Sequence, residues 1–289
     1  MSSHNITSPK KTISSYNFEY YPESTMDFWC TNRSFLYGDG LFETLFYRNG
    51  NIEFLEVHIE RLRNGLHILA MECPELEDIS SVRQHIEKLL SLQVPAQQQY
   101  RIKIIAWRKP GGLFSPDSHE CNIVILVKPS EATYFGTTKT CLPYDENPLY
   151  PHSLSPYKRT SSLHYIYAGL YQKKKKCDDV LLMTKKHQYY ASECLYSNIF
   201  WIKDDVLYTP SLEAGCINGI IRQQLLSKAE KMGFTVSTGL FPIEDIIGAE
   251  HVFSANSAGL KLLQSIDGHQ LNSSEEVIKS IAEEIFFGE

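Results

Sequence analysis

The sequence predicts an α+β protein built from two domains. Its 289 residues are 43% hydrophobic and 21% charged, which is enough apolar material for one large or two modest globular cores. Apolar residues at helical spacing alternate along the chain with short apolar or aromatic segments that are bounded by turn residues. The division we expect is a flexible N-terminal tail over 1–16, a smaller α+β domain over 17–130 and a larger α+β domain over 131–289.

The smaller domain is expected to combine strands with two helices. A short aromatic segment at 17–21 is typical of an edge strand, and Asn49-Gly50-Asn51 marks the turn of a hairpin. Helical spacing of apolar residues begins at Glu56 and indicates a helix that packs one stripe beneath the sheet. The predicted elements are strands at 17–21, 41–47, 52–55, 100–107 and 121–127, and helices at 56–70 and 79–92.

The larger domain is expected to alternate strands and helices after a strand that begins at Thr137. The proline-rich stretch 143–156 is predicted to be a loop. The boundary between the two domains is the default location for a binding site. The other predicted strands are at 180–183, 189–191, 199–202, 206–208 and 251–254 and near Thr235, and the predicted helices are at 161–175, 219–232 and 275–286.

The charge and composition of the chain narrow the classes of partner. Lysine and arginine number 28 against 34 aspartates and glutamates, so the formal net charge is −6. An acidic chain lacks the basic field of a nucleic-acid or anionic-membrane binder, and no apolar run reaches the roughly 20 residues of a membrane-spanning helix. The N-terminal segment does not resemble a secretory signal. We therefore expect a cytoplasmic protein with no nucleic-acid partner and no membrane partner.

The cysteines and histidines do not form a ligand pattern. The seven cysteines are odd in number, widely scattered and without a CxxC pair. They predict free thiols in a reducing compartment and argue against a disulfide framework or a zinc cluster. His58 and His67 are nine residues apart, which is not a same-face chelating spacing on a helix. No metal site is expected.

Two turns and one arginine are candidates for binding a phosphate. Gly219 starts a predicted helix whose first amide N–H groups would point to an anion, although Gly215 and Gly219 could also simply form a turn. Asn256 and Ser257 follow a predicted strand in the same way. Arg61 lies on the first predicted helix, where its guanidinium could pair with a phosphate or form a surface salt bridge.

Lys158 and Glu193 complete a set of residue types that suits one cofactor. Lys158 lies in a polar junction between a loop and a helix. Glu193 has apolar flanks that predict burial, so its carboxylate needs a cationic or N–H partner. Pyridoxal phosphate (PLP) requires an amine for its aldehyde, a carboxylate for its ring nitrogen and a basic, amide-lined cup for its phosphate. Composition alone leaves open whether these residues converge.

Five motifs in order resemble the class IV aminotransferase family, the fold type IV PLP enzymes with the D-amino-acid aminotransferase-like fold. The first block is YGDGLFETL with HIERL, and the second is Lys158 followed by Leu163, Tyr165 and Ala168. The later blocks are ECLYSNIFWI, GCINGIIRQQLL after YTP, and VFSANSAG. The likeness runs from about Arg33 to the C-terminus and implies that the larger domain binds PLP.

The resemblance also implies a role for each candidate residue. Lys158 would form the internal Schiff base and carry the proton, and Glu193 would keep the pyridine nitrogen protonated. The phosphate would be bound by Arg61, Asn256, Ser257 and the amides of Ile220 and Ile221.

Further implications of the resemblance concern one departure from the family, the oligomer and the substrate. The family usually has threonine where this chain has Ile221, so only the backbone amide remains there to bind phosphate. Family members are homodimers with sites near the interface, and the loop from Tyr37 to Gly40 would reach toward the site. The substrate is a small-molecule amine, and Tyr37 and Arg108 are the residues expected to contact it, Arg108 through a substrate carboxylate.

Three chemistries compete within the family: lysis of 4-amino-4-deoxychorismate to 4-aminobenzoate and pyruvate, branched-chain transamination, and D-amino-acid transamination. The segments CINGIIRQ, FSANSAG and RKPGGLFSPD resemble lyase members more than transaminases. Against the lyase, FET at 42–44 is shared by several subgroups, and the lysine helix lacks the asparagine and arginine of some lyases. The lyase is the favoured function and an amino-acid aminotransferase the alternative. A catalytically idle PLP-binding homologue is the hypothesis from another class.

Overall fold

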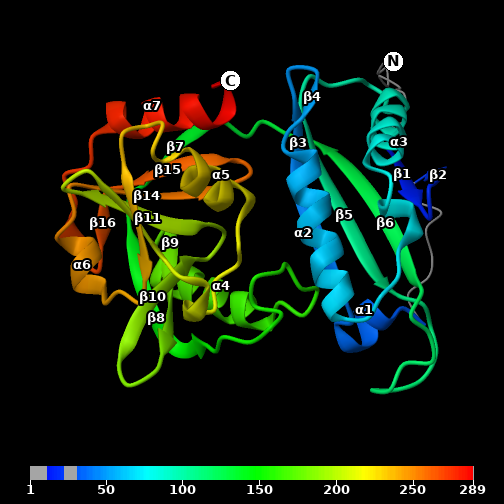
Figure 1. Ribbon diagram of the computed structural model, residues 1–289, viewed down its shortest axis with the longest axis horizontal. Coiled ribbons are helices and arrows are strands. Elements are labelled where there is room, and N and C mark those ends of the chain that lie inside the picture. Colours follow the sequence, from blue (N-terminus) through cyan, green and yellow to red (C-terminus); the bar gives the residue numbers. More distant parts are fainter. Residues whose placement is uncertain (1–11, 23–30, 289) are drawn as a thin grey trace, which may run out of the picture. The chain divides into compact units, whose positions relative to one another are not determined.

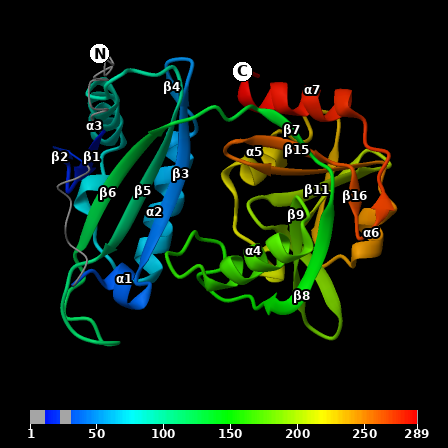
Figure 2. The ribbon, with the colours of Figure 1, turned by 180° about the vertical axis from the view of Figure 1, so that it is seen from behind.

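The computed structural model describes residues 12–22 and 31–288 and divides the chain into two compact units, Met1–Glu131 and Ala132–Glu289. Each unit combines helices with sheet (Figures 1 and 2), so the predicted α+β class is confirmed. Residues 1–11 of the expected N-terminal tail lie outside the described residues.

The first unit is built on one six-stranded antiparallel sheet. Its elements are β1 (Ile13–Tyr16), β2 (Glu19–Pro22), α1 (Arg33–Tyr37), β3 (Gly40–Arg48), β4 (Asn51–Ile52), α2 (Leu55–Ile68), the 3-10 helix η2 (Pro74–Leu76), α3 (Ile79–Ser91), β5 (Tyr100–Arg108) and β6 (Cys121–Pro129). The strand order is β2-β1-β6-β5-β3-β4, and every neighbouring pair is antiparallel. Helices α2 and α3 cover one face of this sheet (Figures 1 and 2).

The core of the first unit forms because alternate residues of each strand face the helices. In β3, Leu41, Glu43 and Leu45 share one face and are almost completely buried, as the two-residue period of a strand requires. Helix α2 packs on β3, and its Ile59 and Leu62 are buried. Glu43 is the exception in this core because it places a carboxylate among apolar side chains.

The N-terminal hairpin differs from the sequence prediction. Strand β1 takes in the last residues of the predicted tail and pairs with both β2 and β6. Asn17 and Phe18 adopt positive φ angles of 45° and 62° and form a two-residue turn, so the strand predicted at 17–21 begins at Glu19. The prediction of a flexible tail is therefore wrong for 13–16, because ladder hydrogen bonds to β6 order this segment.

The second unit contains a five-stranded and a six-stranded sheet, ordered β10-β9-β8-β16-β17 and β13-β12-β11-β14-β15-β7. Its strands are β7 (Phe135–Thr138), β8 (Cys141–Leu149), β9 (Asp179–Lys185), β10 (Tyr189–Cys194), β11 (Asn198–Lys203), β12 (Val206–Pro210), β13 (Thr235–Gly239), β14 (His251–Asn256), β15 (Gly259–Leu263), β16 (Ser265–Ile266) and β17 (His269–Gln270). Its helices are α4 (Leu163–Lys175), η3 (Leu212–Ala214), α5 (Ile220–Lys228), α6 (Ile243–Ile247) and α7 (Glu275–Phe286). Helix α4 packs on β8 and β9, whereas α5 and α7 contact each other and pack on β14 and β15 (Figure 1).

The predicted loop over 143–156 is wrong in its first half, because 141–149 form β8. Strand β8 pairs with β9 along one edge, whereas β16 pairs with its other edge only at Cys141. Proline is tolerated where a strand lacks a second neighbour, which explains how Pro143 and Pro148 fit. The predicted helices 161–175, 219–232 and 275–286 are found as α4, α5 and α7, with α5 ending earlier than expected.

Candidate active site

Glu193 is a buried carboxylate that a bulge in β10 positions. In the ladder with β9, Ala191 lies opposite Met183 and Glu193 lies opposite Leu182, so Ser192 is one extra residue. A bulge of this kind changes the direction of the neighbouring side chains. Glu193 is 3% exposed, which confirms the burial predicted from its apolar flanks.

Three donors from different segments hold the Glu193 carboxylate. Oη of Tyr165, on α4, donates to Oε1 at 2.7 Å. The backbone N–H of Ile217 donates to Oε2 at 3.2 Å, and Nδ2 of Asn198 donates to the same oxygen at 3.5 Å. Burial and the neighbouring carboxylate raise the pKa of Tyr165 well above its usual value, so the phenol keeps its proton and remains a donor. The carboxylate therefore has the N–H and O–H partners that its burial requires.

The turn that leads into α5 is packed against Asn198. Nδ2 of Asn198 donates to the carbonyl oxygen of Ile217 at 2.8 Å. A Cβ atom at Gly219 would lie 2.0 Å from Oδ1 of Asn198, so only glycine fits at the residue before α5. No side chain of the described residues caps this helix. Its first amides, which include those of Ile220 and Ile221, thus have the arrangement that binds anions.

The residues of the NGI-x-RQ segment bond to one another around this turn. Nη1 of Arg222 donates to Oδ1 of Asn218 at 3.1 Å, and Nε2 of Gln223 donates to the carbonyl oxygen of Asn218 at 3.3 Å. Nη2 of Arg222 donates to the carbonyl oxygen of Pro210, at the end of β12, at 3.1 Å. Burial lowers the pKa of Arg222. The three side chains form a clamp, named here the Asn218 clamp, that sets the path of the chain into α5.

Lys158 lies half-buried in the loop between β8 and α4. The backbone N–H of Asn218 donates to the carbonyl oxygen of Pro156 at 3.0 Å, so the turn before α5 is bonded to the chain two residues before Lys158. Oγ of Ser155 accepts from the backbone N–H of His152 at 3.0 Å and orders the same loop. The structure therefore brings the Lys158 loop next to the amino end of α5.

Asn256 and Ser257 lie at the tight turn between β14 and β15. Oδ1 of Asn256 accepts from the backbone N–H of Ala258 at 2.8 Å, and its Nδ2 donates to the carbonyl oxygen of Tyr196 at 2.9 Å. The side chain of Asn256 thus shapes this turn and joins it to the turn that follows Glu193. We correct its expected role accordingly, because protein groups already occupy its amide. Ser257 occupies the turn itself, between the paired residues Asn256 and Gly259.

In the first unit, Arg61 belongs to a buried cluster of charged side chains. Its Nε donates to Oε1 of Glu43 at 2.7 Å and its Nη2 donates to Oε2 at 2.5 Å. Nδ1 of His58 lies 2.7 Å from Oε2 of Glu43. Burial raises the pKa of Glu43, but Arg61 and His58 outweigh burial and lower this pKa to about 2. Arg61 is 5% exposed, so the alternative of a surface salt bridge is wrong.

Arg108, in contrast, anchors loops of the first unit. Its Nε donates to Oδ2 of Asp39 at 3.0 Å and its Nη2 donates to the carbonyl oxygen of Leu69 at 2.6 Å. Its Nη1 donates to the carbonyl oxygens of Ala70 and Ser118 at 3.2 and 3.1 Å. Arg108 is 4% exposed. The prediction that Arg108 binds a substrate carboxylate is therefore wrong, because the protein's own acceptors surround the guanidinium.

Tyr37 ends α1 on an exposed apolar surface. Its ring is 38% exposed and lies 4.8 Å from Cζ of Arg33 and 5.8 Å, between ring centroids, from Phe114. Nε of Arg33 donates to Oδ2 of Asp39 at 2.8 Å, the oxygen that Arg108 also uses. The roles of Arg33 and Asp39 were not predicted from the sequence, since nothing in their spacing indicates a shared carboxylate. Tyr37 keeps an exposed face for a ligand or a partner.

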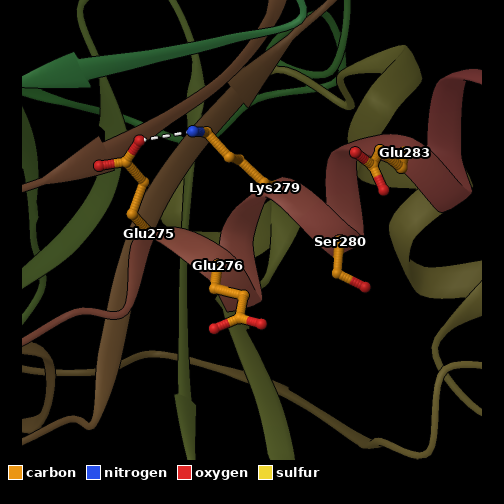
Figure 3. Close-up of a pocket in the computed structure, with 5 residues that line it drawn as sticks. All are labelled: Glu275, Glu276, Lys279, Ser280 and Glu283. Carbon is orange, nitrogen blue, oxygen red and sulfur yellow. Dashed lines mark ion pairs between the residues drawn. The ribbon is translucent and has the colours of Figure 1, made fainter.

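The groove drawn in Figure 3 contains none of the candidate residues. It is lined by one helix, α7, through Glu275, Glu276, Lys279, Ser280 and Glu283. Glu275 and Lys279 form an ion pair of 2.7 Å, and Figure 3 shows the other side chains spread along the helix without converging. A binding site requires convergent groups, so we assign no function to this groove.

Three further properties concern metals, membranes and thiols. In residues 12–22 and 31–288 no three histidine, cysteine, aspartate or glutamate side chains are grouped to hold a metal ion. Within the same ranges, no helix combines the length and apolar character needed to cross a membrane. The six described cysteines are free thiols, and Cys30 lies outside the described residues.

Comparison with known proteins relates most of the chain to one family. The model of the family described as amino-transferase class IV matches residues 40–262. The aminodeoxychorismate lyase of Vibrio harveyi is 26% identical over 238 residues, which cover 78% of this chain and 82% of that protein. The probable branched-chain-amino-acid aminotransferase of Rickettsia bellii is 27% identical over 258 residues, which cover 87% of this chain and 86% of that protein.

Solved structures share the fold. The branched-chain amino acid aminotransferase from Escherichia coli matches with a TM-score of 0.84 at 18% identity, over 96% of this chain and 95% of that chain. A putative 4-amino-4-deoxychorismate lyase from Legionella pneumophila matches with a TM-score of 0.79 at 22% identity, over 90% of this chain and 94% of that chain. The predicted fold is thereby confirmed.

Proposed function

This chain belongs to the class IV aminotransferase family, and from this premise we propose that it is a PLP-dependent 4-amino-4-deoxychorismate lyase that releases 4-aminobenzoate and pyruvate. The observation that carries the choice of the lyase is the Asn218 clamp. Its residues Asn218, Arg222 and Gln223 are those of the NGI-x-RQ segment that resembles lyase members, and they bond to one another. The lyase relative from Vibrio harveyi supports the same choice.

The residues around Glu193 fit PLP. A protonated pyridine nitrogen needs an ionised carboxylate, and the donors from Tyr165, Asn198 and Ile217 stabilise Glu193 in that form. The amino end of α5 offers the amide donors that a phosphate needs. Lys158, in the loop bonded to the same turn, supplies the amine for the aldehyde. We assign the phosphate to Arg61, Ser257 and the backbone amides of Ile220 and Ile221.

The proposed reaction depends on proton movement by Lys158. Bound PLP supplies an electron sink for the substrate carbon next to the amine. Lys158 Nζ is the base that takes the proton from this carbon and passes it to the departing enolpyruvyl group, which leaves as pyruvate, and Glu193 holds the proton on the ring nitrogen. Loss of pyruvate leaves an aromatic product, so the lyase needs no second keto acid, whereas an aminotransferase does.

Two further assignments belong to the same proposal. Tyr37 contacts the amino substrate, since its ring remains exposed at the end of α1. The protein works in the cytoplasm, where the free thiols of its six described cysteines remain reduced.

The products of the purified protein distinguish the lyase from the aminotransferase. We expect aminodeoxychorismate to give 4-aminobenzoate and pyruvate in equal amounts without a keto-acid acceptor. If no 4-aminobenzoate forms but an amino acid is converted in the presence of 2-oxoglutarate, the lyase proposal is wrong. The aminotransferase, which the Rickettsia bellii relative supports, then replaces it. Both the lyase and the aminotransferase are ruled out if the protein stays colourless with PLP and borohydride does not fix the cofactor on Lys158.

We also propose that the enzyme is a homodimer that uses α4. Leu163, Ile166, Tyr167 and Leu170 are 64%, 56%, 55% and 57% exposed and follow helical spacing, so they form one apolar stripe on the surface of the second unit. A two-fold axis can place the same stripe of a second copy opposite it. We expect the wild type to sediment as a dimer and Ile166→Lys as a monomer. A monomeric wild type would contradict the proposal.

A further inference from the structure

The first unit places a carboxylate where its sheet otherwise presents core side chains to α2. Glu43 lies between the buried Leu41 and Leu45 on the same face of β3. Burying a carboxylate costs free energy unless strong partners offset the loss of water. An apolar residue of similar volume often serves stability as well as a buried ion pair does. The charged cluster at Glu43 therefore calls for an explanation other than core stability.

The pairing of Glu43 with Arg61 fixes the plane of the guanidinium group. Nε of Arg61 bonds Oε1 at 2.7 Å and Nη2 bonds Oε2 at 2.5 Å, which is a side-on bidentate pair. Because both bonds use the Nε–Nη2 edge, the end of the group that carries Nη1 points away from Glu43 in the same plane. His58, three residues before Arg61 on α2, contacts Oε2 through Nδ1 at 2.7 Å and holds the carboxylate as well.

We propose that Glu43 is a positioning residue: together with His58 it orients Arg61 so that the Nη1 end of the guanidinium faces the phosphate of PLP. The inference rests on the proposed function, in which Arg61 binds this phosphate. An arginine side chain loses rotamer freedom when it binds a ligand, and an arginine that is already held in place loses less. Glu43 offsets part of the positive charge of Arg61, so its contribution is orientation of the guanidinium and not added attraction.

A second buried ion pair in the same sheet provides a matched control. Arg48, at the end of β3, bonds Oε2 of Glu53 through Nη1 at 3.2 Å. The side chains of Arg48 and Glu53 are both largely buried, as are those of Arg61 and Glu43. Glu53→Gln therefore removes a carboxylate from a buried arginine, as Glu43→Gln does, but leaves Arg61 and its partners unchanged.

The test compares the binding of PLP with that of pyridoxal, which lacks the phosphate. Dissociation constants for both are measured by equilibrium dialysis with the wild type and with Glu43→Gln, His58→Gln and Glu53→Gln, and urea unfolding is recorded for each. We expect the wild type to prefer PLP. Glu43→Gln should lose about tenfold of this preference, the size expected for a misplaced charge-assisted contact, with pyridoxal binding unchanged. His58→Gln should lose less, and Glu53→Gln should keep the full preference.

The possible outcomes separate this inference from the proposed function. A folded Glu43→Gln variant with the full preference for PLP overturns the inference, and so does an equal loss of preference in Glu53→Gln. If Glu43→Gln does not fold, a full preference in His58→Gln overturns it. The proposed role of Arg61 fails in a different way: the wild type then shows no preference, or Arg61→Ala keeps the wild-type preference.

Discussion

Replacing Gly219 with alanine tests how far the turn before α5 depends on Asn198. The new Cβ atom would lie 2.0 Å from Oδ1 and 3.3 Å from Cγ of Asn198, and the first distance is far below van der Waals contact. Asn198 is almost completely buried, and it cannot move without losing its 2.8 Å bond to Ile217 and its 3.5 Å contact with Glu193. Each buried polar group left without a partner costs about 1–3 kcal/mol. We therefore expect Gly219→Ala to lower the free energy of unfolding by about 2–4 kcal/mol.

Urea denaturation of four variants measures this effect. Gly136→Ala is the control, since its Cβ meets only Cγ of Lys261 at an ordinary 3.6 Å, and its free energy of unfolding should change by no more than about 0.5 kcal/mol. In an Asn198→Ala background the obstacle is absent, so Gly219→Ala should then cost less than about 1 kcal/mol. The single Gly219→Ala variant should also bind PLP more weakly, because the amides of α5 shift. An equal cost in both backgrounds, or a Gly219→Ala variant as stable as the control, would refute this reasoning.

Four further variants test separate parts of the site and the fold. Lys158→Ala should abolish turnover while Arg61→Ala mainly weakens PLP retention, because the proposed function gives Lys158 the chemistry and Arg61 the positioning of the cofactor; unchanged PLP affinity in dialysis of Arg61→Ala would contradict this. Arg108→Ala should lower the free energy of unfolding by about 3 kcal/mol or more, since it removes one of the two guanidinium groups that bond Asp39 and the buried donor of the Leu69, Ala70 and Ser118 carbonyl groups; an equally stable variant with a raised KM alone would restore the substrate role. Burial raises the pKa of Asp179 from 3.8 to about 6, so the stability linked to its protonated form is present below pH 3.8 and is lost as the pH rises to about 6. Asp179→Asn keeps the acceptor oxygen for the backbone N–H groups of Val180 and Leu195 but removes the buried charge. The variant should therefore stabilise the protein at pH 8, by up to about 3 kcal/mol, but not at pH 4. Urea unfolding at both pH values checks this, and a destabilised variant at pH 8 would show that the charge is favourable.

Local features of the fold and the site could be predicted from the sequence where a strong periodic or compositional signal exists. The helix predicted at 275–286 is observed with the same bounds, because its apolar residues repeat at helical spacing and Ser274 caps it. The burial of Glu193 followed from its apolar flanks. The prolines at 143 and 148 misled the prediction, because whether proline fits a strand depends on which neighbours that strand has.

The sequence by itself determined which residues are proposed for the chemistry: the Lys158 amine, the Glu193 carboxylate and the glycine that precedes α5. Only the tertiary structure decided what these groups contact. Tyr165 and Ile217, which hold Glu193, are 28 and 24 residues away from it, on a helix and in a turn that no local pattern joins to β10. Arg108 shows the same limit, since its acceptors are mostly backbone carbonyl groups that every residue has. Periodicity along a chain records burial and local hydrogen bonds, whereas the meeting of distant side chains depends on strand order and loop paths, which the packing of the whole unit sets.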